Sequence, residues 1–320
     1  MEGQPKDKPK LLSWADFPEG MNRFNLDPTG VQLNPQELFP GVYVLVSSKG
    51  GVNHTGFVVG RKGVLVVDAH INVAMARQIQ RAIQTVTNKP MLFLVNANHH
   101  GDHTFGNCAF HPETLIVQQR RTAELTPYFA EEKAFLLSSV GNDPEKIFEG
   151  VELRLPDIVF DSYLRFDLGG ITVETHYFGP GNAPGDTVTY IPEGKIAFTG
   201  NMTGSTMVLT LWTDAPTYLN SLSKFAQTLA VDTLIPSHTP RTTGEVIGQE
   251  LHYLADLNNE VMKAVQAGWS MEEAQERIAL KENFLPPPER RGPFNYGNNH
   301  KYNIMRTYKS LVSEKKGLGI

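Results

Sequence analysis

Residues 96–107 read NANHHGDHTFGN and follow the apolar run MLFLV at 91–95. Three histidines and one aspartate fall between positions 99 and 103, which is the density of a metal site. Imidazole nitrogens and carboxylate oxygens are donors that zinc prefers in proteins. The position where such a motif usually opens is Asn98, whose amide is a poor ligand. The stretch predicts a metal centre at the end of a strand, with one ligand position altered.

The segments before this cluster alternate between strand-like and helical patterns. Residues 43–60 contain two β-rich runs around a pair of glycines, which is typical of a hairpin. GVLVVDAHI at 63–71 predicts a strand that is covered on both faces. Residues 72–87 have helical spacing, with Asn72 as the N-cap. This β-β-β-α-β order places the histidines past the carboxyl end of a strand, where open α/β sheets bind ligands.

The second half of the chain repeats the strand pattern and then becomes helical. We expect strands at 164–170, 171–179, 186–191, 196–200 and 231–238, and helices at 120–150, 215–229 and 302–315. Ser270 and Glu273 form a capping box for a further helix. We expect residues 1–39 to be an N-terminal arm, and 40–320 to be one domain with a C-terminal helical extension from about residue 245.

Composition excludes several classes of protein. The chain has 320 residues, of which 40% are hydrophobic, so it can bury a sizeable core. The net charge is −5 with the two signs nearly balanced, so we expect no nucleic-acid partner. The longest apolar runs have the length of strands, so we expect no membrane span. The single Cys108 excludes an internal disulfide and fits a reducing, cytoplasmic compartment, although a removed leader peptide is compatible with the same sequence.

Five separated motifs occur in a fixed order. They are Asp68, HHGDH at 99–103, GPGNAPGDTV at 179–188, FTGN at 198–201 and IPSH at 235–238. In this order and spacing they resemble the metallo-β-lactamase superfamily from about Val42 to His238. The resemblance implies an α/β fold, an αβ/βα sandwich of two mixed β-sheets with helices outside. It also implies a metal cleft at one edge, between the sheets.

Seven groups hold two zinc ions in the usual pattern of this family, and three of the seven positions here are asparagine. Those three positions are Asn98, Asn182 and Asn201. One of the two metal positions normally uses the groups at 98, 100 and 182, and it retains only His100. A cation held by one imidazole and two weak amides would not stay, so the resemblance implies that this position is lost.

The other metal position is intact. The resemblance implies one zinc per chain, held by Asp102, His103, Asn201 and His238 with room for a water ligand. Asn201 replaces a carboxylate that normally bridges the two metals, and the alternative is that its amide only supports the ligands. One dication against the single charge of Asp102 plus hydroxide leaves the site near neutral, so the change from Asp to Asn keeps a one-metal site balanced.

This donor set, with a free histidine two positions before the aspartate, is similar to that of the hydrolytic chlorothalonil dehalogenases. The resemblance implies that zinc-bound hydroxide replaces an aromatic chlorine of a chlorinated nitrile, and that Asp102 and His100 are catalytic. His100 would accept the proton of the water or orient the substrate, and the alternative is a structural histidine. Asn98, Asn182 and Trp212 are the candidate substrate contacts, although Trp212 is equally compatible with a core position.

Two other functions remain open at this stage. One is an ordinary hydrolase of an ester, lactone or thioester, and the other is a non-catalytic protein that retains the fold. If the protein is a dehalogenase or an ordinary hydrolase, its partner is a small molecule. For the dehalogenase, this molecule is a chlorinated aromatic compound. The long arm and the helical extension exceed what the sandwich requires, so we also expect a homodimer.

Overall fold

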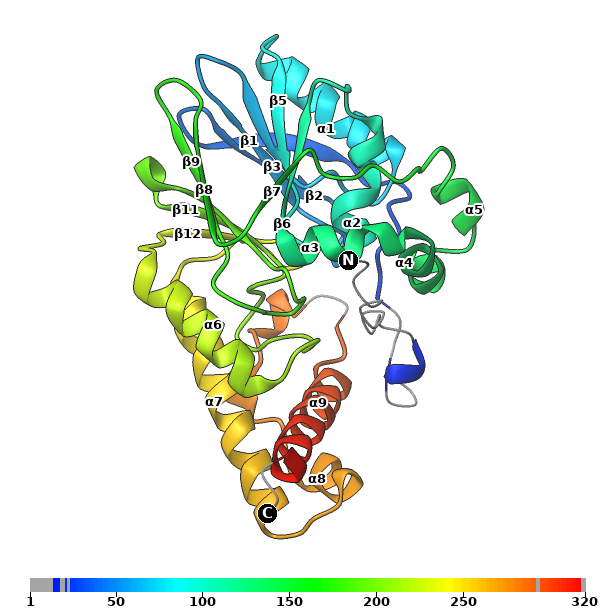
Figure 1. The fold of residues 1–320 in the computed structure, drawn as a ribbon, viewed down its shortest axis with the longest axis vertical. Helices are drawn as coiled ribbons and strands as arrows, with labels where there is room; N and C mark the ends of the chain where they lie inside the picture. Colours follow the sequence, from blue (N-terminus) through cyan, green and yellow to red (C-terminus); the bar gives the residue numbers. More distant parts are fainter. Residues whose placement is uncertain (1–13, 18–20, 22–23, 292–293, 318–320) are drawn as a thin grey trace, which may run out of the picture.

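The structure is a computed structural model that describes residues 14–17, 21, 24–291 and 294–317 (Figure 1). The first of two sheets has the strand order β1-β2-β3-β4-β5-β6-β7. Its strands are β1 Leu33–Phe39, β2 Val42–Ser47, β3 Thr55–Val59, β4 Val64–Val67, β5 Met91–Val95, β6 Leu115–Gln119 and β7 Ile158–Phe160. Neighbours are antiparallel from β1 to β4 and parallel from β4 to β7.

The second sheet has the order β12-β11-β10-β9-β8. Its strands are β8 Tyr163–Asp167, β9 Thr172–His176, β10 Val188–Ile191, β11 Ile196–Gly200 and β12 Thr233–Pro236. The pair β11 and β12 is parallel, and the other neighbours are antiparallel. The helices are α1 Val73–Val86, α2 Gly101–Thr104, α3 Arg120–Leu125, α4 Phe129–Leu136, α5 Pro144–Ile147, α6 Ala215–Thr228, α7 Glu245–Gln266, α8 Met271–Arg277 and α9 Tyr296–Gly317.

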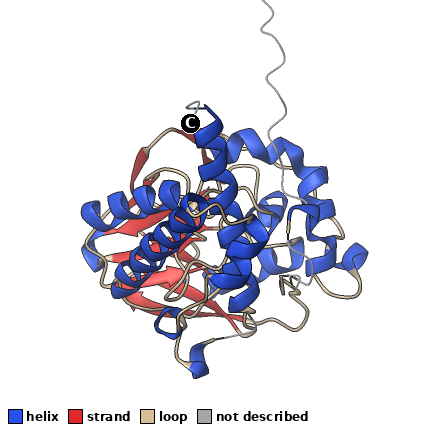
Figure 2. Cartoon of the chain, turned by 90° about the horizontal axis from the view of Figure 1, so that it is seen from below, coloured by secondary structure: helices blue, strands red, loops and turns tan. Residues whose placement is uncertain are grey.

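Three apolar cores correspond to three interfaces between layers. The central core joins the inner faces of the two sheets, for example Val67 of β4 with Phe198 of β11. A second core packs α1 through Ile79 and other buried residues onto the outer face of the first sheet. The third packs α6 and α7 onto the second sheet. Strands therefore lie between helical layers, as the view from below also shows (Figure 2), and the predicted αβ/βα sandwich is confirmed.

Short-range signals in the sequence are accurate. The side chain of Asn72 caps α1 by accepting from the N–H of Met75 at 2.9 Å. Ser270 and Glu273 form the expected capping box at the start of α8. The Pro192–Gly194 turn with left-handed Lys195 (φ 47°) joins β10 to β11 where the hairpin was expected. Each feature depends on a few adjacent residues, which is why pattern alone predicts it.

Three element predictions differ from the structure. Residues 33–39, expected to belong to the arm, form edge strand β1, where Pro35 is tolerated because one side of the strand lacks a partner. The region 120–150 is not one helix but several short ones. Pro127 lies just after the end of α3, and Pro144 is the first residue of α5, so the two prolines divide the region. The last helix begins at Tyr296, six residues before its expected start.

The described part of the N-terminal arm packs on the body of its own chain. Trp14 stacks on Phe135 of α4, with ring centroids 5.0 Å apart, and Phe17 stacks on Tyr302 of α9 at 4.6 Å. The arm thus connects the sandwich with the helical extension, which occupies the lower part of Figure 1. Within the described part of the chain, no helix is both long and apolar enough to span a membrane.

Candidate metal centre

The candidate ligands and the neighbouring Asp68 follow the carboxyl ends of four strands. Asp68 follows β4, the histidine cluster follows β5, Asn201 follows β11 and His238 follows β12. These ends meet because β4 and β5 are parallel, β11 and β12 are parallel, and the two sheets face each other. A hydrogen bond of 2.8 Å from the N–H of Thr187 to the carbonyl of Ala97 joins the two sheets at this edge.

Asp102, His103 and His238 form a compact donor group. Asp102 Oδ2 lies 3.3 Å from His103 Nε2 and 3.2 Å from His238 Nε2. One ligand atom from each residue lies within 4.8 Å of the others, as a shared cation requires. Asp102 and His103 are buried and His238 is half-buried, so the group has only one partly open side. The three residues that the sequence assigns to the intact position are thus brought together.

Both imidazoles are anchored through the nitrogen that faces away from this group. His103 Nδ1 lies 2.8 Å from the carboxylate of Asp68, and His238 Nδ1 lies 2.8 Å from the carbonyl of Gly51. An oxygen acceptor on Nδ1 keeps a proton there, so Nε2, which is turned toward Asp102, is the nitrogen that would bind a metal. This is the arrangement of metal-ligating histidines, in which the outer hydrogen bond fixes tautomer and ring orientation.

Asp68 connects the strand ends with the ligands. Its Oδ1 accepts from the N–H of Ala97 at 2.7 Å while its Oδ2 holds His103. Its backbone is left-handed (φ 63°), a conformation that aspartate tolerates better than most residues. These contacts fit a carboxylate that supports His103 and the loop at Ala97.

The charges around the donor group favour a cation. Burial opposes the ionisation of Asp102, but His103 and His238 outweigh it and hold the pKa of this carboxyl well below its usual range. Burial lowers the pKa of His103, whereas Asp68 and Asp102 raise it more strongly, to about 9. Two buried carboxylates thus surround one imidazole, and a divalent cation would neutralise them. The residues present fit a metal ion.

Asn201 is the candidate for a fourth donor. Among the described residues its buried Oδ1 has no hydrogen-bond partner, and the residue lines the same cavity as Asp102 and His238. The preceding Gly200 is left-handed (φ 54°), and a Cβ there would lie 2.5 Å from the side chain of Ala97. A glycine is therefore required for the chain to turn at this point and present Asn201. An unpaired amide oxygen at this place is what a fourth ligand needs.

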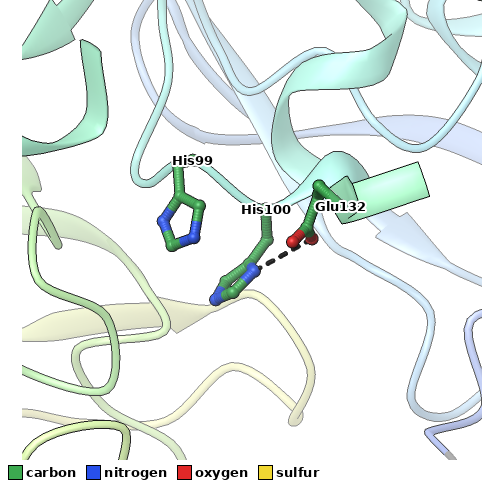
Figure 3. A group of neighbouring side chains, drawn as sticks. All are labelled: His99, His100 and Glu132. Carbon is green, nitrogen blue, oxygen red and sulfur yellow. Dashed lines mark hydrogen bonds and ion pairs between the residues drawn. The ribbon is translucent and has the colours of Figure 1, made fainter. Parts of the chain in front are cut away.

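The altered half of the centre is built differently (Figure 3). His100 Nδ1 lies 3.1 Å from Glu132 Oε1 of α4, which also accepts from the N–H of Gly101 at 3.2 Å. His100 lines the cavity, and its buried Nε2 has no partner in the described part of the chain. The ring of His99 lies beside that of His100, with 4.2 Å between their centroids. His99, His100 and Glu132 also have the spacing of cation donors, but Glu132 is already occupied by two N–H donors.

The two asparagines of this half make internal hydrogen bonds. Asn98 Oδ1 accepts from the N–H of His100 at 2.9 Å, and the residue is fully buried. Asn182 Nδ2 donates to the carbonyl of Thr210 at 2.5 Å and approaches its hydroxyl at 3.1 Å. Asn182 lines the cavity, whereas Asn98 is not among its lining residues and holds the loop of His100. Asn98 Oδ1 and Asn182 Nδ2 thus have partners of their own, whereas Asn98 Nδ2 is buried without one among the described residues.

A cavity of about 130 Å³ opens onto the donor group. Cavities on the order of 150 Å³ accept a benzene ring, so this is space for a single ring. Trp212 forms part of the wall and packs edge-on against His100, with 4.1 Å between ring centroids. Phe24 of the arm and Phe294 of the extension add aromatic surface. Among the described residues that line the cavity, none is a lysine or an arginine.

Two acidic residues at this site were missed from the sequence. Glu132 comes from a short helix with no distinguishing pattern, and no sequence signal would have identified it. Glu250 is different, because it interrupts the buried stripe of α7. Its neighbours on that stripe are Val246, Ile247, Tyr253, Leu254 and Leu257. A charged residue at an apolar position of an amphipathic helix is a usable signal.

Comparison with known families agrees with this geometry. The family model described as the metallo-beta-lactamase superfamily matches residues 49–238, which contain all four candidate ligands. The match ends at His238, so the helical extension lies outside it.

Solved structures of similar fold have low sequence identity to the chain. A metallo-beta-lactamase from Pontibacter korlensis is 20% identical with a TM-score of 0.57, over 70% of this chain and 99% of that one. A metallo-beta-lactamase from Erythrobacter litoralis is also 20% identical, with a TM-score of 0.54 over 69% and 96%. A stereoselective inverting sec-alkylsulfatase from Pseudomonas sp. is 16% identical, with a TM-score of 0.64 over 87% of this chain and 50% of that one. The chain thus spans half the length of the alkylsulfatase.

Proposed function

Because this chain belongs to the metallo-β-lactamase superfamily, we propose that it is a hydrolase with one zinc ion that replaces an aromatic chlorine of a chlorinated nitrile by hydroxyl. The observation that carries the proposal is the asymmetry of the site. Three clustered donors, two of them anchored imidazoles, lie on one side with the unpaired amide oxygen of Asn201 in the same cavity, and a single-ring space with an aromatic wall occupies the other. Asp102, His103, Asn201 and His238 would hold the ion. When bound, zinc supplies Lewis acidity and lowers the pKa of a water ligand to about 7.

His100 provides the proton acceptor in this scheme. Its Nε2 is unpaired beside the cavity, while Glu132 holds Nδ1 and thereby fixes the direction of the ring. In the net reaction water forms a C–O bond to the ring carbon, the C–Cl bond breaks, and chloride leaves with the bonding pair. The proton passes to His100 Nε2 and then to solvent. Such positioned proton transfer contributes roughly 10²- to 10⁴-fold to a rate.

The cavity also selects for an uncharged substrate. Trp212 and the two phenylalanines offer faces for a ring, and Asn182 lies in the same wall. Sulfate esters, on which an alkylsulfatase acts, are anions, and the described lining offers no lysine or arginine to bind one. The hydrogen bond of Asn98 to His100 supports a role in holding the loop rather than in contacting substrate.

The decisive test combines metal analysis with turnover of chlorothalonil. Protein purified without chelator should contain about one zinc per chain, release chloride, and place oxygen from labelled water in the phenol. An ester and a lactone are assayed in parallel. Two zincs with ester or lactone hydrolysis would replace the proposal by an ordinary hydrolase. A chain that binds no metal and turns over nothing would be a non-catalytic member of the family.

We also propose that the protein is a homodimer. Leu153, Leu155, Val159 and Tyr163 are exposed along or next to the adjoining edge strands β7 and β8. Exposed edge strands with apolar side chains are surfaces for pairing with another chain. Light scattering coupled to size exclusion should give the mass of two chains, and the mass of one chain would refute this part.

A further inference from the structure

Glu250 of α7 is a buried acid that faces the cavity. The side chain is 0% exposed, and the residue lines the same cavity as Asp102 and His238. Its Oε1 accepts from the backbone N–H of Gly204 at 2.6 Å. Its Oε2 is buried and has no hydrogen-bond partner among the described residues. One oxygen of this carboxyl is thus used by the protein, and the other is unpaired within the wall of the cavity, shielded from water.

The surroundings of Glu250 favour its uncharged form. Burial raises its pKa well above the usual range, and the N–H of Gly204 opposes this only in part. Within the described residues it makes no ion pair. A carboxyl group that is buried without a cation favours the protonated form. In that form the proton is on Oε2, because Oε1 accepts from Gly204, and Oε2 is a donor without an acceptor among the described residues.

We propose that Glu250 is a substrate-contacting residue, whose Oε2 donates a hydrogen bond to an acceptor atom of an uncharged aromatic substrate, such as a nitrile nitrogen. The inference rests on the proposed function for the class of substrate. It adds a second recognition point to the cavity, separate from the metal donors and from Trp212. A buried donor with no partner in the protein is costly, and a ligand acceptor accounts for it.

The position of Glu250 in the chain supports a role in specificity. It lies in the helical extension, beyond the residues 49–238 that the family model covers. The metal donors thus come from the shared part of the fold, and this acid comes from a part of the chain outside the match. α7 packs against α6 and α9, which fixes the direction from which the side chain enters.

A purely structural role has to be separated from substrate contact. Glu250 holds Gly204, and Gly204 belongs to the loop that follows Asn201, so its loss could disturb a metal ligand. Glu250→Gln is the matched variant, because an amide oxygen can accept from Gly204 while the amide nitrogen donates into the cavity. Glu250→Met has similar length and no donor. Zinc content and thermal unfolding of both variants are measured alongside binding.

The experiment measures binding of two unreactive probes by titration calorimetry on metal-loaded protein. We expect the parent and Glu250→Gln to bind 1,3-dicyanobenzene about tenfold more tightly than 1,3-dichlorobenzene, and Glu250→Met to lose this preference while binding the dichloro compound like the parent. The inference is overturned if the parent shows no preference, if Glu250→Gln loses it, or if Glu250→Met weakens both probes equally. Chloride release from chlorothalonil is assayed separately. A nitrile preference without chloride release would refute the dehalogenase and still support this contact.

Discussion

The intact and altered halves of the centre use the same kind of residue in different ways. In the intact half, His103 and His238 are anchored at Nδ1 and turn Nε2 toward a shared carboxylate. In the altered half, His100 is anchored at Nδ1 in the same manner, yet the two other ligand positions hold asparagines, whose Oδ1 (Asn98) and Nδ2 (Asn182) bond within the protein. An anchored imidazole alone does not define a metal ligand. The number of donors that converge on its free nitrogen does.

Removal of a ligand from the intact half tests this contrast most strongly. Asp102→Ala should abolish zinc binding and reduce dechlorination on the order of 10³-fold or more, because the ion supplies several kcal/mol of stabilisation. Asn182→Ala, in the altered half, should retain the zinc. Metal content by emission spectroscopy and chloride release measure both. If His100→Ala empties the site while Asp102→Ala does not, the two halves have been assigned the wrong way round.

Restoring the usual metal ligands of the altered half should have the next largest effect. The triple variant with Asn98→His, Asn182→His and Asn201→Asp restores the family's usual donors on a backbone of the same spacing. We expect zinc to rise toward two per chain and dechlorination to fall on the order of 10²-fold, because a second cation would occupy the space beside His100 and misplace the substrate. Ester or lactone hydrolysis would be the activity to monitor for a gain. A folded triple variant with two zincs that dechlorinates like the parent would show that the asparagines have no part in the mechanism.

The same contrast shows what the sequence could and could not reveal. Motif order predicted the sandwich, and it also singled out Asp102, His103 and His238, which the fold brings together because family spacing fixes where each strand ends. Caps such as Asn72 were predicted because they depend on adjacent residues. Edge strand β1 was missed although it forms a tight hairpin with β2 around Pro40 and Gly41, because its exposed residues are polar and Pro35 interrupts the strand pattern. Glu132 could not be predicted, since it reaches His100 only through the packing of α4 against α2.

Weakening a support of the intact half should have a smaller effect than removing a ligand. Asp68→Asn keeps a residue that tolerates the left-handed backbone (φ 63°) and an oxygen that can accept from Ala97. It removes the charge that faces His103. Loss of such a support typically costs 10- to 100-fold in metal affinity, so we expect a zinc dissociation constant raised by roughly that factor. Competition with a chromophoric chelator measures it. An unchanged affinity would mean that Asp68 only holds the loop.

The smallest expected effect comes from the support of the altered half, and it separates the two halves most finely. Glu132→Gln keeps an oxygen that can accept from His100 Nδ1 and Gly101, but removes the negative charge beside the ring. If His100 handles a proton and does not bind zinc, kcat should fall roughly tenfold, a fraction of the 10²- to 10⁴-fold range of general base catalysis. Zinc content and KM should stay near those of the parent. Glu131→Gln is the matched control, since Glu131 precedes Glu132 in the same first turn of α4 and is exposed. Loss of zinc in Glu132→Gln would make His100 a ligand after all, because only a ligand would transmit the change at Glu132 to the metal.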